Sequence, residues 1–159
     1  PNESLCDDRA SHSGQWICHE LTASLGLYSP QDYEILEREV QKVVIGNLDG
    51  IDWEVGERLQ YLGHERQTPI GRPDILLQGV ESRTLFVGEL KPGRARREDV
   101  GQLQSYVGWF RKSTAPEFKA VKGILLAREI DEAAKYAIEA NPDLQARVFK
   151  LDISISTLE

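Results

Sequence analysis

The chain has 159 residues, a formal net charge of −7, and a composition that is 40% hydrophobic and 28% charged. This length suits one hydrophobic core, and no apolar run is long enough to span a membrane. The negative charge argues mildly against a dedicated nucleic-acid binder, because such proteins carry a basic face. Two cysteines do not make a disulfide framework and fit a reducing compartment, so we expect a cytoplasmic location.

Residues 1–28 are mixed in character, and we separate them from a domain over 29–159. The stretch 15–27 has a pattern compatible with a short helix. The chain starts at Pro1 rather than Met and shows no secretory signal, which would fit a fragment of a longer protein. Four potential metal ligands gather in this segment without the spacing of a zinc module, so we expect them to be incidental: Cys6, His12, Cys18 and His19.

A first helix is expected from the sequence "SPQD" (29–32), in which serine can cap, proline suits the first turn, and an acid follows three residues after the cap. Glycine and asparagine at 46–50 predict its end. Six residues fall on one face at helical spacing: Tyr33, Leu36, Val40, Val43, Val44 and Asn47.

Beyond the first helix, the period predicts three strands, over 58–67, 71–79 and 83–91, with a hairpin at 79–82. Pro92 and Gly93 are expected to stop the third strand, because proline cannot continue the ladder. Helices over 97–112 and 131–140 then alternate with strands over 121–128 and 147–153. This order predicts an α/β fold with a mixed sheet, antiparallel in its first three strands and flanked by helices.

Opposite charges stand at the end of the hydrophobic third strand. Glu89 and Lys91 share one face of that strand, and the hairpin can bring Asp74 beside Glu89. Two carboxylates that close repel each other unless a cation lies between them, and oxygen ligands suit Mg²⁺ or Mn²⁺. With the lysine alongside, this set is what metal-assisted phosphodiester hydrolysis needs. The alternative interpretation is a salt bridge of Lys91 with Glu89 or Asp74 at the sheet edge.

Two helices offer further polar residues. On the helix over 97–112, Gln102 and Tyr106 flank a core stripe and could reach the strand ends, although an exposed glutamine is the alternative. On the first helix, Glu37 and Glu39 border the apolar face on opposite sides, and helical geometry slightly favours Glu37 as an added acid. The core stripe of the second helix consists of Val100, Leu103, Val107 and Phe110.

A basic cluster follows the charged strand. Arg94, Arg96 and Arg97 would grip a nucleic-acid backbone in one interpretation and form a solvated loop in the other. Arg72, directly before Pro73 and Asp74, is a further candidate for nucleic-acid binding. Tyr106 or Trp109 would stack on an unpaired base, although core packing suits Trp109 better. A smooth strip on the second helix favours a homodimer: Gly101, Ser105 and Gly108.

The sequence resembles the PD-(D/E)xK nuclease superfamily, and more narrowly the nuclease domain of the NucS/EndoMS endonucleases. The resemblance covers roughly 37–127. It rests on four segments in the family's order and spacing: "ExxVQxxVxxNL", "GRPDILLQG", "LFVGELKPGRA" and "VGQLQSYVGWF". The departure lies at the front, because NucS carries a separate N-terminal DNA-binding and dimerisation domain for which residues 1–28 are too short.

The resemblance implies a restriction-endonuclease-like core in which Asp74 and Glu89 bind metal and Lys91 is the catalytic lysine. It also implies that Gln102 acts with support from Tyr106 and that Glu37 is the acid of the first helix. The function expected is a Mg²⁺- or Mn²⁺-dependent endodeoxyribonuclease for mismatched, branched or foreign DNA. The alternative is a non-catalytic nucleic-acid-binding or assembly module that keeps the fold.

Overall fold

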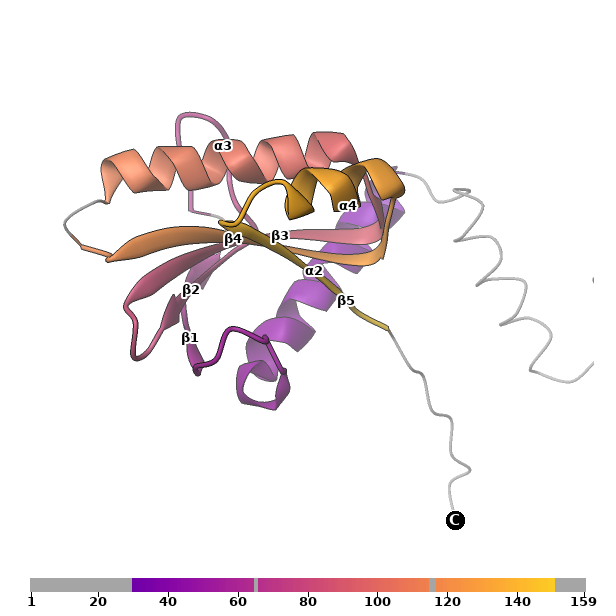
Figure 1. The fold of residues 1–159 in the computed structure, drawn as a ribbon. Helices are drawn as coiled ribbons and strands as arrows, with labels where there is room; N and C mark the ends of the chain where they lie inside the picture. Colours follow the sequence, from indigo (N-terminus) through magenta and orange to yellow (C-terminus); the bar gives the residue numbers. More distant parts are fainter. Residues whose placement is uncertain (1–29, 65, 115–116, 151–159) are drawn as a thin grey trace, which may run out of the picture.

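In the computed structural model, residues 30–64, 66–114 and 117–150 are described (Figure 1). They form, in chain order, helix α2 (Pro30–Gly46), a 3-10 turn η1 (Leu48–Gly50), strands β1 (Leu59–His64), β2 (Ile75–Gly79) and β3 (Thr84–Ala95), helix α3 (Arg97–Ser113), strand β4 (Ala120–Ile130), helix α4 (Glu132–Glu139) and strand β5 (Leu144–Val148). The separate N-terminal segment predicted over residues 1–28, with its cysteines and histidines, lies outside the described residues.

The five strands form one mixed sheet in the order β1-β2-β3-β4-β5. The β1/β2 and β2/β3 pairs are antiparallel, whereas β3/β4 and β4/β5 are parallel. The two parallel connections run through α3 and α4, because parallel neighbouring strands need a long crossover, which is usually a helix. The predicted α/β class, with its antiparallel first half, is therefore confirmed, and β3 is the central strand.

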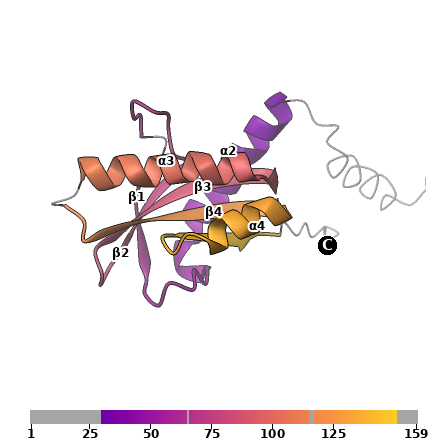
Figure 2. The same ribbon diagram turned by 45° about the horizontal axis from the view of Figure 1, so that its top comes forward.

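The helices cover both faces of the sheet. In Figures 1 and 2, α3 and α4 lie over one face, and α2 crosses the other. Each face has its own core, because side chains of a strand alternate between faces. The α3 side buries Leu85, Val87 and the predicted helix stripe, and the α2 side buries Phe86, Leu90 and Ile124. All four residues of that stripe are buried, as expected: Val100, Leu103, Val107 and Phe110.

The third strand does not stop at Pro92 and Gly93, so this prediction is wrong. β3 continues to Ala95, and the β3/β4 register shifts between Lys91 and Arg94. The irregularity accommodates a proline, which has no N–H to give to the ladder. Arg96 alone separates β3 from α3, and the Asp131 N–H binds the Ala95 carbonyl at 3.0 Å. The strand with the predicted charges therefore leads directly into the helix that carries Gln102.

The buried face of α2 also differs from the prediction. Val40 and Val44 are buried, but Val43 is 53% exposed and Asn47 is exposed. Gln41 is buried in their place, because its amide has a backbone partner across the interface. The last strand lies earlier than expected, at Leu144–Val148. Within the described residues, no helix is long and apolar enough to cross a membrane.

Candidate active site

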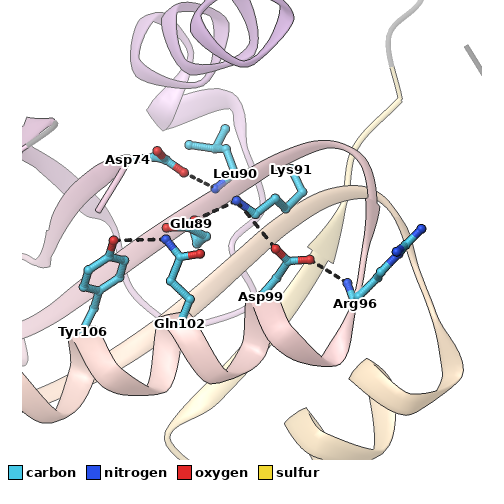
Figure 3. A network of polar contacts seen from close by, with 8 residues as sticks. All are labelled: Asp74, Glu89, Leu90, Lys91, Arg96, Asp99, Gln102 and Tyr106. Atoms are coloured by element: carbon cyan, nitrogen blue, oxygen red, sulfur yellow. Dashed lines mark hydrogen bonds and ion pairs between the residues drawn. The ribbon is translucent and has the colours of Figure 1, made fainter. Parts of the chain in front are cut away.

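Asp74 and Glu89 meet where β2 begins, beside the middle of β3. The β2/β3 register pairs Ile75 with Gly88, so the next residues along the two strands are Asp74 and Glu89. The Asp74 N–H binds the Gly88 carbonyl at 3.1 Å, and the Leu90 N–H donates to Asp74 Oδ2 at 2.6 Å. The second contact holds the Asp74 carboxylate against the backbone N–H of Leu90, between Glu89 and Lys91 (Figure 3).

Glu89 is a buried carboxylate on the central strand, with an exposed fraction of 2%. Burial, together with the nearby charge of Asp74, raises the pKa of Glu89 to about 7. Its Oε1 accepts a hydrogen bond from Lys91 Nζ at 2.8 Å, but Oε2 is buried without a hydrogen-bond partner. A buried carboxylate oxygen in this condition is costly, and the contact with Lys91 leaves the cost of Oε2 uncompensated.

Lys91 is held between two acids. Its Nζ lies 2.8 Å from Glu89 Oε1 and 3.7 Å from Asp99 Oδ1 (Figure 3). Burial alone would lower the pKa of Lys91, but the charge of Glu89 and its hydrogen bond, together with Asp99, raise it above the ordinary value. The amine is therefore a cation at neutral pH. The salt bridge of the alternative interpretation is present, although it lies on the central strand and not at a sheet edge.

Gln102 and Tyr106 are one turn apart on α3, and Gln102 Nε2 donates to the Tyr106 hydroxyl at 3.1 Å (Figure 3). The Tyr106 ring is 3% exposed within the core, so its face is not available to a base, and the stacking prediction for Tyr106 is wrong. Trp109 packs against the core, edge-on to Phe110. Tyr106 can instead orient Gln102, as the family resemblance implies.

Helix α2 completes the site from the other face of the sheet. Glu37 lies one turn before Gln41, whose Nε2 donates to the Asp74 carbonyl at 2.5 Å. The charge of Glu37 contributes to the raised pKa of Glu89, so the two acids are close in space. Glu39 instead forms a surface ion pair with Lys42 at 2.7 Å. Of the two candidate acids of this helix, the structure brings Glu37 to the site.

A pocket of about 350 Å³ unites these residues. It is lined by seven side chains from four segments of the chain: Glu37, Arg38, Arg72, Asp74, Glu89, Lys91 and Gln102. Six of them belong to the predicted site, and Arg38 is the addition. Neither Arg38 nor Asp99 nor Gln41 is predicted from the sequence.

The basic cluster takes a different course from the one expected. Arg94 belongs to β3 and pairs with Glu129 at 2.9 Å, whereas Arg97 belongs to α3 and lies 3.9 Å from Glu98. Arg96 lies between the two elements with an exposed side chain. None of these three arginines lines the pocket. The cluster is therefore not a loop, and its role in nucleic-acid binding stays a prediction.

The donor set agrees with a hard divalent cation. Asp74 and Glu89 supply carboxylate oxygens, one of them the orphaned Oε2 of Glu89, and such oxygens are the ligands that Mg²⁺ prefers. Mg²⁺ is commonly held by one or two carboxylates and keeps several waters. Among the described residues, no group of three or more His, Cys, Asp or Glu is arranged to hold a metal ion. The fit therefore rests on a carboxylate pair.

Comparison with protein families decides the relationship. The family described as the endonuclease NucS C-terminal domain matches residues 36–152. The chain belongs to this family. The matched range contains every pocket residue of the NucS-like site and ends close to the last described strand. No curated protein matches the chain.

Solved structures agree with the NucS assignment. An EndoMS–dsDNA complex is similar with a TM-score of 0.61 at 25% identity, over 74% of this chain and 46% of that one. A repair endonuclease from Pyrococcus abyssi follows with a TM-score of 0.60 at 24% identity, over 72% and 46%. An apo form of EndoMS has a TM-score of 0.58 at 25% identity, over 74% and 47%. The chain thus spans about half the length of these NucS-like neighbours.

Proposed function

We propose that this NucS-like domain is an endodeoxyribonuclease that hydrolyses DNA phosphodiester bonds with Mg²⁺ or Mn²⁺. The single observation that carries the proposal is the buried Glu89, whose Oε2 has no partner although it lies beside a second acid and a lysine. A domain that served only assembly would need no such charges. Membership of the NucS family and the likeness to an EndoMS–dsDNA complex support DNA as the substrate.

Asp74 and Glu89 would hold the cation. When bound, the ion would neutralise charge on the phosphate and make a water molecule more acidic at neutral pH. Lys91, with its raised pKa, would stabilise the negative charge that develops on the phosphate oxygens as water adds to phosphorus and one ester bond breaks. Gln102, oriented by Tyr106, would direct its amide toward the water or a phosphate oxygen.

The natural substrate is proposed to be mismatched, branched or foreign DNA. The net charge of −7 agrees with a cleavage domain that relies on another domain, or on a second subunit, for many of its phosphate contacts. A homodimer and further domains of a longer chain are part of this proposal, as is action in the cytoplasm.

Cleavage assays test the proposal. The protein is incubated with single-stranded, duplex, flapped and mismatched DNA in Mn²⁺ or in EDTA, beside the variants Asp74→Ala, Glu89→Ala and Lys91→Ala. All three variants should lose cleavage by at least a hundredfold, and Lys91→Ala should still bind Mn²⁺ by calorimetry. Glu129→Ala, which removes an acid outside the pocket, is the control and should cut at the parent rate.

Two results would contradict the proposal. Cleavage by all three variants at the parent rate would show that the active site lies elsewhere. No cleavage of any substrate by the parent protein, together with no binding of Mn²⁺, would favour the non-catalytic assembly module.

A further inference from the structure

Two arginines from separate parts of the chain face the same pocket. Arg38 comes from the middle of α2, and Arg72 from the segment between β1 and β2. Both arginines are exposed residues that line the pocket.

The two segments are braced against each other. The buried Gln41, three residues after Arg38, donates from Nε2 to the carbonyl of Asp74, two residues after Arg72. This bond of 2.5 Å ties the helix to the start of β2. The backbones that carry the two arginines are therefore held at a fixed separation, which lowers the entropic cost of binding one ligand with both side chains.

The segment that carries Arg72 is itself rigid. Thr68 and Gly71 form a closed turn with backbone hydrogen bonds of 2.8 and 3.3 Å, and the buried Thr68 hydroxyl donates to the Gly71 carbonyl at 2.6 Å. Gly71 packs against the Tyr106 hydroxyl, and Pro73 is fully buried. Arg72 is thus anchored on both sides, while its own side chain stays exposed.

The charges of the pocket agree with an anionic ligand. Three acidic and three basic side chains line it, so a bound divalent cation would leave an excess of positive charge. Lys91 pairs with Glu89 and Asp99 and is less exposed than the two arginines of the pocket. Guanidinium groups bind phosphate oxygens in bidentate fashion, so the two arginines offer two phosphate sites in the pocket that holds the acid pair.

We propose that Arg38 and Arg72 form a clamp that binds the sugar-phosphate backbone of one DNA strand beside the bond to be cut. The clamp places the scissile phosphate over Asp74 and Glu89. This inference rests on the proposed function, and it moves the main phosphate contacts away from the cluster at 94–97. The clamp reads no sequence, because both arginines contact the backbone and not the bases.

The salt dependence of DNA binding tests the clamp. Arg38→Gln, Arg72→Gln and the double variant are made in the Glu89→Gln background, and affinity for a 20-base-pair duplex is measured in EDTA at several salt concentrations. Each lost phosphate contact should lower the slope of log K against log salt by about 0.9, and the double variant should lower it by about 1.8. Thermal unfolding of each variant confirms that the fold is retained.

Lys42→Gln is the matched control. It removes a cation from the same helix, one turn beyond Arg38, where the side chain is 71% exposed and outside the pocket. The slope of log K against log salt for Lys42→Gln should stay within about 0.3 of the parent's slope. Slopes that are unchanged in both arginine variants, or lowered as much by Lys42→Gln, would overturn the clamp.

The clamp and the proposed function fail separately. If the protein with Glu89 cuts DNA but the arginine variants keep the parent slope, the clamp is wrong and the nuclease remains. If the slopes fall as expected but no substrate is cut in Mn²⁺, the clamp stands as a binding device and the nuclease proposal falls.

Discussion

The carboxylate of Asp99 connects the start of α3 to the amine of Lys91. One oxygen accepts the Arg96 N–H at 2.7 Å, and the other lies 3.7 Å from Lys91 Nζ. Asp99 is therefore fixed by the helix that it helps to begin, and it in turn positions Lys91 over Glu89. Substitution of Asp99 can separate the effects of these two contacts, because an amide keeps the hydrogen bond to Arg96 and loses the ion pair with Lys91.

Asp99→Asn should keep the stability of the fold but lower the cleavage activity. The amide oxygen can still accept the Arg96 N–H, whereas the charge near Lys91 is gone. We expect kcat to fall roughly tenfold through misplacement of the amine, with KM for DNA unchanged. Asp99→Ala should show the same loss and should also destabilise the fold by about 1 kcal/mol in urea unfolding, because it removes the hydrogen bond at the helix start.

Glu98→Gln serves as the control for Asp99, since it removes a neighbouring acid that is 74% exposed. A parent-like kcat in Asp99→Asn would show that the acid serves only to start α3.

The pH dependence of stability should report Glu89. In the native state its pKa is about 7, whereas an unfolded glutamate titrates near about 4.3, so the native state holds this proton more tightly. The contribution is fully present below the unfolded pKa and is lost as pH rises through about 7. In EDTA, the parent should lose about 2 kcal/mol more than Glu89→Gln between about pH 5.5 and 8.

Urea unfolding at the two pH values measures this difference. Mn²⁺ at pH 8 should restore stability to the parent and not to Glu89→Gln, because a cation that binds only the native state stabilises it. Identical pH profiles for the two proteins would contradict the assignment of Glu89 as the group that titrates near neutrality.

Gly71→Ala should destabilise the fold through two separate effects. The backbone at Gly71 has φ +129°, which residues that carry a side chain rarely adopt. A Cβ would also lie 2.6 Å from the Tyr106 hydroxyl oxygen. We expect a loss of roughly 1–3 kcal/mol in chemical unfolding. In a Tyr106→Phe background the loss should be smaller, because the nearest remaining ring atoms are 3.4 Å away. Additive effects of the two substitutions would disprove the contact.

Gly101→Ala should stabilise the protein. A Cβ at Gly101 or Gly108 meets no described atom within 4 Å, and glycine in a helix interior costs about 0.5–1 kcal/mol relative to alanine. At low protein concentration, where the chain is a monomer, the melting temperature should therefore rise. A fall would show that something outside the described residues packs on this face.

The same strip tests the predicted homodimer. Light scattering across concentrations should show a dimer that Gly101→Leu weakens, because the larger side chain would prevent close approach. A strictly monomeric protein at every concentration would make the homodimer prediction wrong.

The antiparallel half of the fold was predictable because short-range rules govern it. Alternation in β2 and β3 puts Asp74 and Glu89 on one face, and the short connection between the strands sets their register. Local periodicity likewise predicts the buried stripe of α3. These features depend on neighbours in sequence, so the residues themselves carry the information.

The features that escaped prediction depend on partners far away in the chain. Gln41 is buried because it binds the Asp74 carbonyl 33 residues later, and no helical period reveals such a bond. β3 passes through Pro92 because its parallel partner β4 tolerates a register shift there. Asp99 left a signal, an acid in the first turn of α3, but its contact with Lys91 follows only from the packing of helix on sheet.

The junction of β3 and α3 has a consequence for how substrate enters. Because Arg96 is the sole residue between them and the Ala95 carbonyl is bound by the Asp131 N–H, strand β3 and helix α3 form one unit with no linker that could serve as a hinge. Helix α2 contributes Glu37 from the opposite layer, and η1 and the irregular stretch before β1 follow it. The site therefore does not widen by moving Glu89 and Lys91 of β3 away from Gln102 of α3.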